Sequence, residues 1–474
     1  MSDLHELTAT EQVQAIASRR VSSRELVEHY LERIDRHDAT LAAFITVFAD
    51  EARAAADAAD VGTAAGESVG LLHGLPLALK DLHASAGLRT TFGSVVFSDF
   101  VPPADEAPIA NLRAAGAVVI GKTNVCEFGP TCYTDNELRG PTANPYDLQL
   151  SPSGSSGGAA AAVAAGLVGV AHGSDGLGSI RTPAANCGLV GFKTSRGRSA
   201  GSGLGWLALS VQGPLARTVA DAALFLDAMG GASGSDLWHS PPAAPDAFRV
   251  AASTAPPSRQ RVGRMVSPPT VDVDVHADCL AAVDRVVAAL EASGHEVVDV
   301  PEIPPTPEVR DAVKVVLSAG LGLTANLVIA PEQREQLMPY TRWLIENNTH
   351  TASELTQAQG VLAAAGSLFA ELVRGYDLLL SPTTTAPPLP TAELRLDDAA
   401  ESFAAMGRWS AFTPGANIAG LPAVSLPVHQ TVHGVPIGAQ LIGQRFADDL
   451  LMSVSAQLEQ HFVWQDRHPP AWTA

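Results

Sequence analysis

The chain has 474 residues, of which 46% are hydrophobic and 17% are charged, as in ordinary globular proteins. Its 30 lysine and arginine residues face 50 aspartate and glutamate residues, and the resulting net charge of -20 argues against nucleic acid or an anionic membrane as a partner. Four cysteines without a CxxC pair give no disulfide framework and no metal site of the zinc type.

The N-terminal third predicts surface helices and no targeting segment. Residues 3–47 carry apolar positions at helical spacing, and Ser23 is a suitable N-cap for a helix over 24–36. The start has no basic segment ahead of an apolar stretch, so we expect a cytoplasmic protein. The most apolar window, 157–172, is too short to span a bilayer, and we interpret it as a buried helix.

Two apolar runs predict buried strands. Residues 71–79 lead directly into Lys80, and residues 118–124 form a second run. Because such strands alternate with alanine-rich segments of helical pattern, the sequence predicts an α/β sheet.

The second half predicts helices and then a return to the sheet. Residues 231–262 and 295–308 have the composition of linkers, but neither is long or polar enough to separate independent domains. We therefore predict a single domain over 1–474, in which 300–375 forms a helical lobe beside a substrate channel. Residues 420–428 and 434–443 predict two strands joined by a short turn.

Two serine-bearing loops carry the strongest chemical signal. Residues 151–166 form a small-residue loop that enters a helix, an arrangement that also binds phosphates, but no Walker lysine and no GxGxxG pattern accompany it. Ser179 closely follows two glycines, and the backbone amides of this loop could hold an oxyanion. A serine nucleophile needs a base. On the residues alone, Lys80, His73 and His172 are comparable candidates.

Three motifs together resemble the amidase signature family. They are GSSGG at 154–158, GLGSIRTPAA at 176–185 and HGLPLALKDL at 73–82, and 24 positions separate Ser155 from Ser179. The similarity also covers segments at 121–128, 142–145, 213–221 and 417–427, which span nearly the whole chain. The resemblance implies a central mixed, mostly parallel β-sheet covered by helices on both faces.

The resemblance also implies a mechanism. Ser179 would be the nucleophile, Ser155 a proton relay that follows a cis peptide bond, and Lys80 the base. The backbone amides of Gly176, Leu177, Gly178 and Ser179 would hold the oxyanion. No cofactor and no metal are implied. The expected partner is a small-molecule amide, with no nucleic acid and no membrane, and a homodimer is among the allowed assemblies.

Asp175 and Arg181 flank the nucleophile at positions that match the family. Such residues more often hold a loop in shape through hydrogen bonds than touch the substrate. We therefore expect a structural role for both.

The substrate pocket is less well specified. Leu177 stands where the family usually has glycine, so its side chain could narrow the acyl pocket, or strain the loop if the position requires positive φ. Thr131, Tyr133 and Trp206 are further candidates for the pocket wall. Apolar residues of the predicted lobe fit either a channel or ordinary helix packing; they are Val315, Leu317, Leu321, Leu323, Leu327, Trp343 and Leu344.

We expect a hydrolase of a neutral, small or moderately hydrophobic carboxamide, because Leu177 is apolar and few basic residues lie near the motifs. Carbamates, cyclic amides and esters are alternative substrates. A glutamine-hydrolysing component of a tRNA-dependent amidotransferase is an alternative function, although Thr182 replaces the glutamine usual there. A Ser-His-Asp hydrolase or a binding protein without catalysis is disfavoured by the joint presence of Lys80, Ser155 and Ser179.

Overall fold

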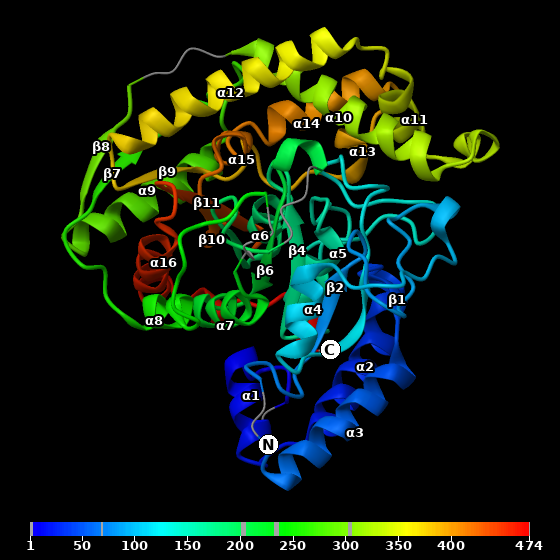
Figure 1. Cartoon of the computed structure of the whole chain (residues 1–474). Helices are drawn as coiled ribbons and strands as arrows, with labels where there is room; N and C mark the ends of the chain where they lie inside the picture. Colours follow the sequence, from blue (N-terminus) through cyan, green and yellow to red (C-terminus); the bar gives the residue numbers. More distant parts are fainter. Residues whose placement is uncertain (1–2, 68–69, 201–204, 232–236, 302–305, 474) are drawn as a thin grey trace.

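The computed structural model describes residues 3–67, 70–200, 205–231, 237–301 and 306–473 (Figure 1). Eleven strands form one sheet in the order β1-β3-β2-β4-β6-β5-β10-β11-β9-β7-β8. The strands are β1 Phe44–Val47, β2 Pro76–Lys80, β3 Val118–Thr123, β4 Val170–Asp175, β5 Val190–Lys193, β6 Val211–Ala216, β7 Arg261–Arg264, β8 Glu296–Asp299, β9 Leu378–Pro382, β10 Ala423–Gln430 and β11 Pro436–Gly443. Strands β7 and β8 lie at or within the predicted linkers, so these segments contribute to the same sheet.

The α/β prediction is confirmed, and the sheet is mixed. Helices α5 (Gly157–Ala164) and α6 (Arg181–Cys187) pack against each other and the sheet, as do α7 (Val219–Met229), α9 (Ala277–Ala292) and α16 (Asp448–Phe462). The expectation of a mostly parallel sheet was wrong: among the described strands, six pairs are antiparallel and four parallel. Apolar runs indicate burial of a strand but carry no information on its direction.

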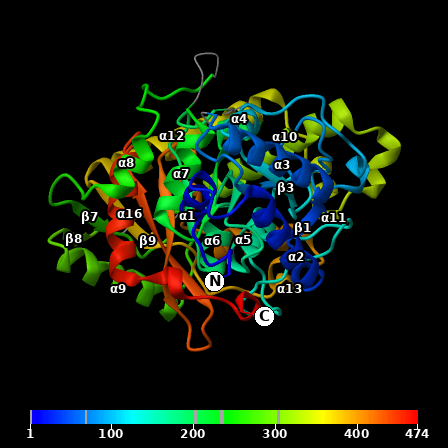
Figure 2. The same ribbon diagram turned by 90° about the horizontal axis from the view of Figure 1, so that it is seen from below.

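Helices α1 (Ala9–Ala17), α2 (Ser23–Leu41) and α3 (Ala49–Ala65) lie at one end of the molecule, near both chain termini (Figures 1 and 2). The predicted N-cap is wrong by one residue. Ser22 caps α2, because its hydroxyl accepts from the Glu25 amide while the Glu25 carboxylate accepts from the Ser22 amide. Ser23 Oγ instead donates to Gly74 O at 2.7 Å.

The apolar window 157–172, predicted as one buried helix, is a helix followed by the start of a strand. Helix α5 ends at Ala164, and β4 begins at Val170. Every residue of α5 is buried, and a Cβ on Gly158 would lie 2.4 Å from the Asn124 amide nitrogen. Small residues are therefore required where this helix crosses the sheet closely.

A helical lobe covers the sheet at the end opposite α1–α3 (Figure 1). It contains α10 (Pro307–Val328), α11 (Pro339–Glu346), α12 (Ala352–Arg374), α13 (Thr391–Leu394) and α14 (Ala399–Trp409), and α15 (Pro414–Ala419) packs on α12. The remaining α-helices are α4 (Ala107–Ala114) and α8 (Ala247–Ser253). Helix α10 is long and apolar enough to cross a membrane by length and composition alone, and 44% of that window is buried within the protein.

Candidate active site

Lys80 and Ser155 form the centre of the site. Lys80 Nζ donates a hydrogen bond to Ser155 Oγ at 2.8 Å and another to Ser174 O at 3.1 Å. Ser155 follows a cis peptide bond with Gly154, as the family resemblance implies. The two side chains come from segments 75 residues apart, so the fold assembles this pair.

Parallel strands explain how Lys80 comes to lie beside the loop that carries Ser179. β2 pairs with β4 in parallel through Ala78 and Ala171, so both strands end at the same edge of the sheet. Lys80 is the last residue of β2, and the loop that carries Ser179 follows β4. The apolar, fully buried residues of β2 therefore place an amine beside the serine loops.

Burial changes the acid–base chemistry of Lys80. Its side chain is 0% exposed, and this desolvation lowers the pKa of Lys80 to about 7. Near neutral pH a large share of the amine is then unprotonated, as a general base requires. The competing histidines have other hydrogen-bond partners: His73 Nε2 contacts Thr63 and Ala59, and His172 Nε2 contacts Gln212.

The loop around Ser179 is held by a buried ion pair. Arg181 contacts the two Asp175 carboxylate oxygens at 2.9 and 3.0 Å, and both side chains are 0% exposed. Burial alone would raise the pKa of Asp175, but the Arg181 guanidinium holds it well below its usual value. Asn417 donates to the same carboxylate at 2.9 Å. These contacts support the structural role expected for Asp175 and Arg181.

Asp175 also binds one of the four backbone amides predicted to hold the oxyanion. The Gly178 amide donates to Asp175 Oδ1 at 2.7 Å, so this N–H is already used inside the loop. The amides of Gly176, Leu177 and Ser179 make no hydrogen bond to the described part of the chain. Within the described part of the chain, three of the four predicted donors therefore have no protein partner, and Gly178 has one.

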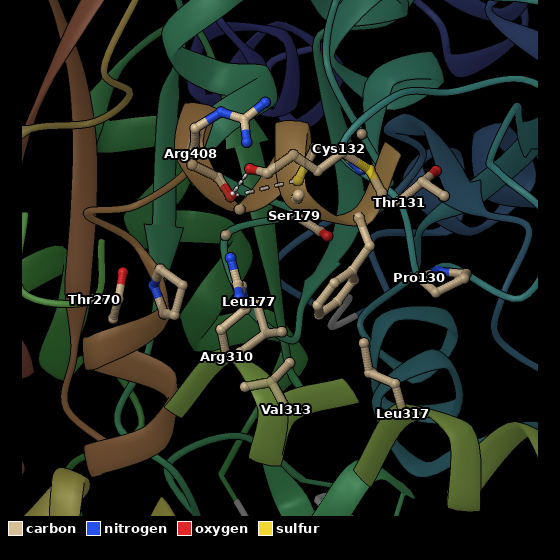
Figure 3. A pocket seen from close by; sticks show the side chains of 18 of the residues that line it. Pro130, Thr131, Cys132, Leu177, Ser179, Thr270, Arg310, Val313, Leu317 and Arg408 are labelled. Carbon is tan, nitrogen blue, oxygen red and sulfur yellow. Dashed lines mark hydrogen bonds between the residues drawn. The ribbon is translucent and has the colours of Figure 1, made fainter. Parts of the chain in front are cut away.

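Leu177 adopts an unstrained backbone. It is not among the residues with positive φ, whereas Gly178 has φ of +136° and a Cβ there would lie 2.4 Å from Thr413 Oγ1. The position that requires glycine is therefore Gly178, and leucine is tolerated one residue earlier. The partly exposed Leu177 side chain lines the pocket in front of Ser179 (Figure 3).

The pocket joins the serine loops to the helical lobe. Thr131, Leu177 and Trp206 line it, as predicted, together with Ser179. Tyr133 does not; it is 3% exposed in the apolar cluster beneath the lobe. The sequence did not identify further lining residues, which come mostly from α10, α11 and α14: Val309, Arg310, Val313, Tyr340, Phe403, Met406 and Arg408.

The predicted channel residues divide between the pocket and the helix core. Leu317 lines the pocket, whereas Leu321 and Leu344 are buried within the lobe. Leu323 and Leu327 are exposed on α10. Ordinary helix packing thus accounts for part of the apolar pattern of the lobe. Of the three residues buried here, only Leu317 also lines the pocket. No group of three potential metal ligands occurs among the described residues.

The serine loops, the buried lysine and the mixed sheet agree with one family. The sequence profile of the Amidase family matches residues 25–452. The chain belongs to the amidase signature family. This amidase is 37% identical over 498 residues to the putative amidase AmiA2 of Mycobacterium tuberculosis, with 98% of this chain and 95% of the relative covered. It is 34% identical to a glutamyl-tRNA(Gln) amidotransferase subunit of Chromohalobacter salexigens, with 98% and 99% covered.

Solved structures give the same assignment. A 6-aminohexanoate cyclic dimer hydrolase in complex with its substrate matches with a TM-score of 0.89 at 30% identity, covering 99% of this chain and 100% of that one. A bacterial aryl acylamidase of the amidase signature family matches with a TM-score of 0.88 at 26% identity, covering 100% and 99%. This amidase is thus a hydrolase of C–N bonds in non-peptide amides.

Proposed function

We propose that this amidase hydrolyses a carboxamide through an acyl-enzyme on Ser179, with Ser155 as proton relay and Lys80 as base. The observation that carries the proposal is the 2.8 Å hydrogen bond between the buried Lys80 amine and Ser155, next to a pocket lined by Ser179 and Gly154. No hydrogen bond joins Ser155 to Ser179 among the described residues; such contacts often tighten only when substrate binds.

The proton transfers follow from this arrangement. Neutral Lys80 accepts the Ser155 hydroxyl proton while Ser155 accepts that of Ser179, and Ser179 Oγ bonds to the substrate carbonyl carbon. The carbonyl oxygen becomes an oxyanion, for which the amides of Gly176, Leu177 and Ser179 are the proposed donors. The C–N bond then breaks as the relay returns a proton to the leaving nitrogen. Water attacks the acyl-enzyme carbonyl carbon while the relay takes one of its protons. The relay then returns that proton to Ser179 Oγ as the ester bond breaks and the carboxylic acid leaves.

The walls of the pocket favour an uncharged, moderately hydrophobic group next to the scissile amide. Leu177, Val313, Leu317 and Met406 surround the approach to Ser179 and offer little hydrogen bonding. An anionic acyl group against these walls would lose its hydration without compensation. Carbamates, cyclic amides and esters of similar shape remain alternative substrates within the same mechanism.

A glutamine-hydrolysing role within an amidotransferase is the second candidate. It is supported by the 34% identity to the amidotransferase relative from Chromohalobacter salexigens. The apolar wall formed by Val313 and Leu317 argues against it, because glutamine is short and its ammonium and carboxylate groups would have to lie against this wall. We therefore favour an amidase that acts on its own small substrate.

Covalent labelling tests the proposed nucleophile. The protein is treated with a fluorophosphonate and the adduct is located by peptide mass mapping, while a panel of small neutral amides is assayed in parallel. We expect one adduct on Ser179 and turnover of at least one amide. An adduct on another serine would reject Ser179, and a folded protein with neither label nor turnover would reject hydrolysis altogether.

Leu177 is expected to limit the size of the acyl group. Leu177→Ala should raise kcat/KM for bulky acyl anilides relative to acetyl anilide by about tenfold, because removing methylene groups enlarges the pocket. The matched control is Leu323→Ala on the exposed side of α10, which should leave the ratio unchanged. An unchanged ratio in Leu177→Ala would show that another side chain limits the acyl group.

A further inference from the structure

Two arginines lie at the open side of the pocket. Arg310 comes from the first turns of α10 and Arg408 from the last turn of α14, and both are exposed lining residues. The two helices meet here: a Cβ on Gly407 would lie 3.9 Å from Arg310 Cδ. In Figure 3 both arginines lie on the same side of the pocket as Thr270. The pocket thus has an apolar interior and a cationic mouth.

Neither guanidinium is tightly bound within the described part of the chain. Arg310 forms one long, exposed ion pair with the neighbouring Asp311 at 3.8 Å, and the Arg408 guanidinium has no ion pair or hydrogen bond there. Some other arginines are bound more closely, as Arg53 is by Glu28 at 2.9 Å and Arg264 by Asp284 at 2.9 Å. Two arginines that line the same pocket thus carry positive charge with little compensation, in a chain whose net charge is -20.

We infer that the substrate carries a carboxylate at the end remote from the scissile amide, and that Arg310 and Arg408 bind it. This inference rests on the proposed function, since Ser179 marks where the scissile bond lies. It agrees with the apolar walls near Ser179, because the uncharged part of the substrate fills the interior while its anionic end remains at the mouth. The planar guanidinium matches the geometry of a carboxylate.

The size of the effect follows from exposure. The Arg310 side chain is 42% exposed, so water and salt weaken its attraction for an anion. Binding at such a rim acts mainly on substrate capture and is sensitive to ionic strength. We therefore expect the carboxylate to change KM by about tenfold and to leave kcat nearly constant.

The experiment compares anionic and neutral substrates of equal length. In one series the acyl group is varied, with mono-4-nitroanilides of linear dicarboxylic acids set against 4-nitroanilides of the ω-hydroxy acids. In the other the amine is varied, with acetyl amides of ω-amino acids set against those of ω-amino alcohols. At one chain length in one series, we expect the carboxylate to lower KM about tenfold, with the preference falling at high salt. Equal or higher KM for the carboxylate in both series would overturn the inference.

Variants assign the preference to the two side chains. In the Arg310→Gln, Arg408→Gln double variant the difference in KM between each carboxylate and its matched hydroxyl compound should disappear. Arg374→Gln, which removes an exposed arginine of α12, should keep it. A double variant that retains the preference would overturn the inference.

A binding measurement keeps this test separate from the proposed function. If no amide is hydrolysed, the proposed function fails, and calorimetry with the same carboxylate and hydroxyl compounds still tests the arginines. Tighter binding of the carboxylate that is lost in the double variant would support the inference. Equal binding of the two compounds would reject it.

Discussion

Lys80→Met is expected to lower kcat/KM for amide hydrolysis by about 10³-fold or more, because it removes the group proposed to accept the Ser155 proton. Methionine has a similar length and suits the apolar surroundings at the end of β2, so the fold should be retained. The measurements are steady-state kinetics and a denaturation curve for both proteins. A folded Lys80→Met protein with nearly full activity would show that the base is another group.

The role proposed for Lys80 also predicts how kcat/KM depends on pH. The pKa of Lys80 is about 7, so at lower pH its amine is protonated and cannot act as a base. Wild-type kcat/KM should therefore rise with pH through about 7 and then level off. Lys193 provides a matched control: burial also lowers its pKa to about 7, but its amine donates to the carbonyls of Thr194 and Leu421. Lys193→Met should keep the rise near pH 7, and residual activity of Lys80→Met should lack it.

Arg181→Met is expected to lower the free energy of unfolding by about 3–5 kcal/mol, because it leaves the Asp175 carboxylate buried without its counter-charge. The loss should appear in urea unfolding at neutral pH. It should be accompanied by lower activity, since Asp175 also holds the Gly178 amide.

An exposed ion pair is the control for this variant. Arg259 and Glu296 lie 3.5 Å apart with side chains 67% and 43% exposed, so Arg259→Met should change the stability by less than about 1 kcal/mol. If Arg181→Met were equally mild, the buried pair would contribute little to holding the nucleophile loop.

The proposed reacting groups could be identified because they lie in short contiguous motifs, with Lys80 at the end of β2, Ser155 just before α5 and Ser179 just before α6. An apolar run that ends in Lys80 predicts a buried amine from sequence alone, and the spacing of Ser155 and Ser179 is visible in the printed chain. The hydrogen bond from Gly178 to Asp175 was not predictable, because four neighbouring amides look equivalent until the loop conformation is known.

The substrate pocket was harder to predict for a different reason. Arg310 and Arg408 come from separate helices and become neighbours only where α10 meets α14. Few basic residues lie near the motifs in the sequence, but these two arginines, which are distant in sequence, line the same pocket as Ser179. Tyr133 was assigned to the pocket although its side chain turns to the core, because sequence does not give side-chain direction in a loop.

The groups proposed to react and the residues that form the outer wall of the pocket are encoded in different parts of the sequence. The atoms proposed to make and break bonds belong to segments between Lys80 and Arg181, whereas the outer wall of the pocket belongs to α10, α11 and α14, all beyond residue 306. A combinatorial library confined to those three helices would therefore sample new substrate ranges without touching the proton relay. Chimaeras that exchange the same helices between relatives would be the corresponding larger step.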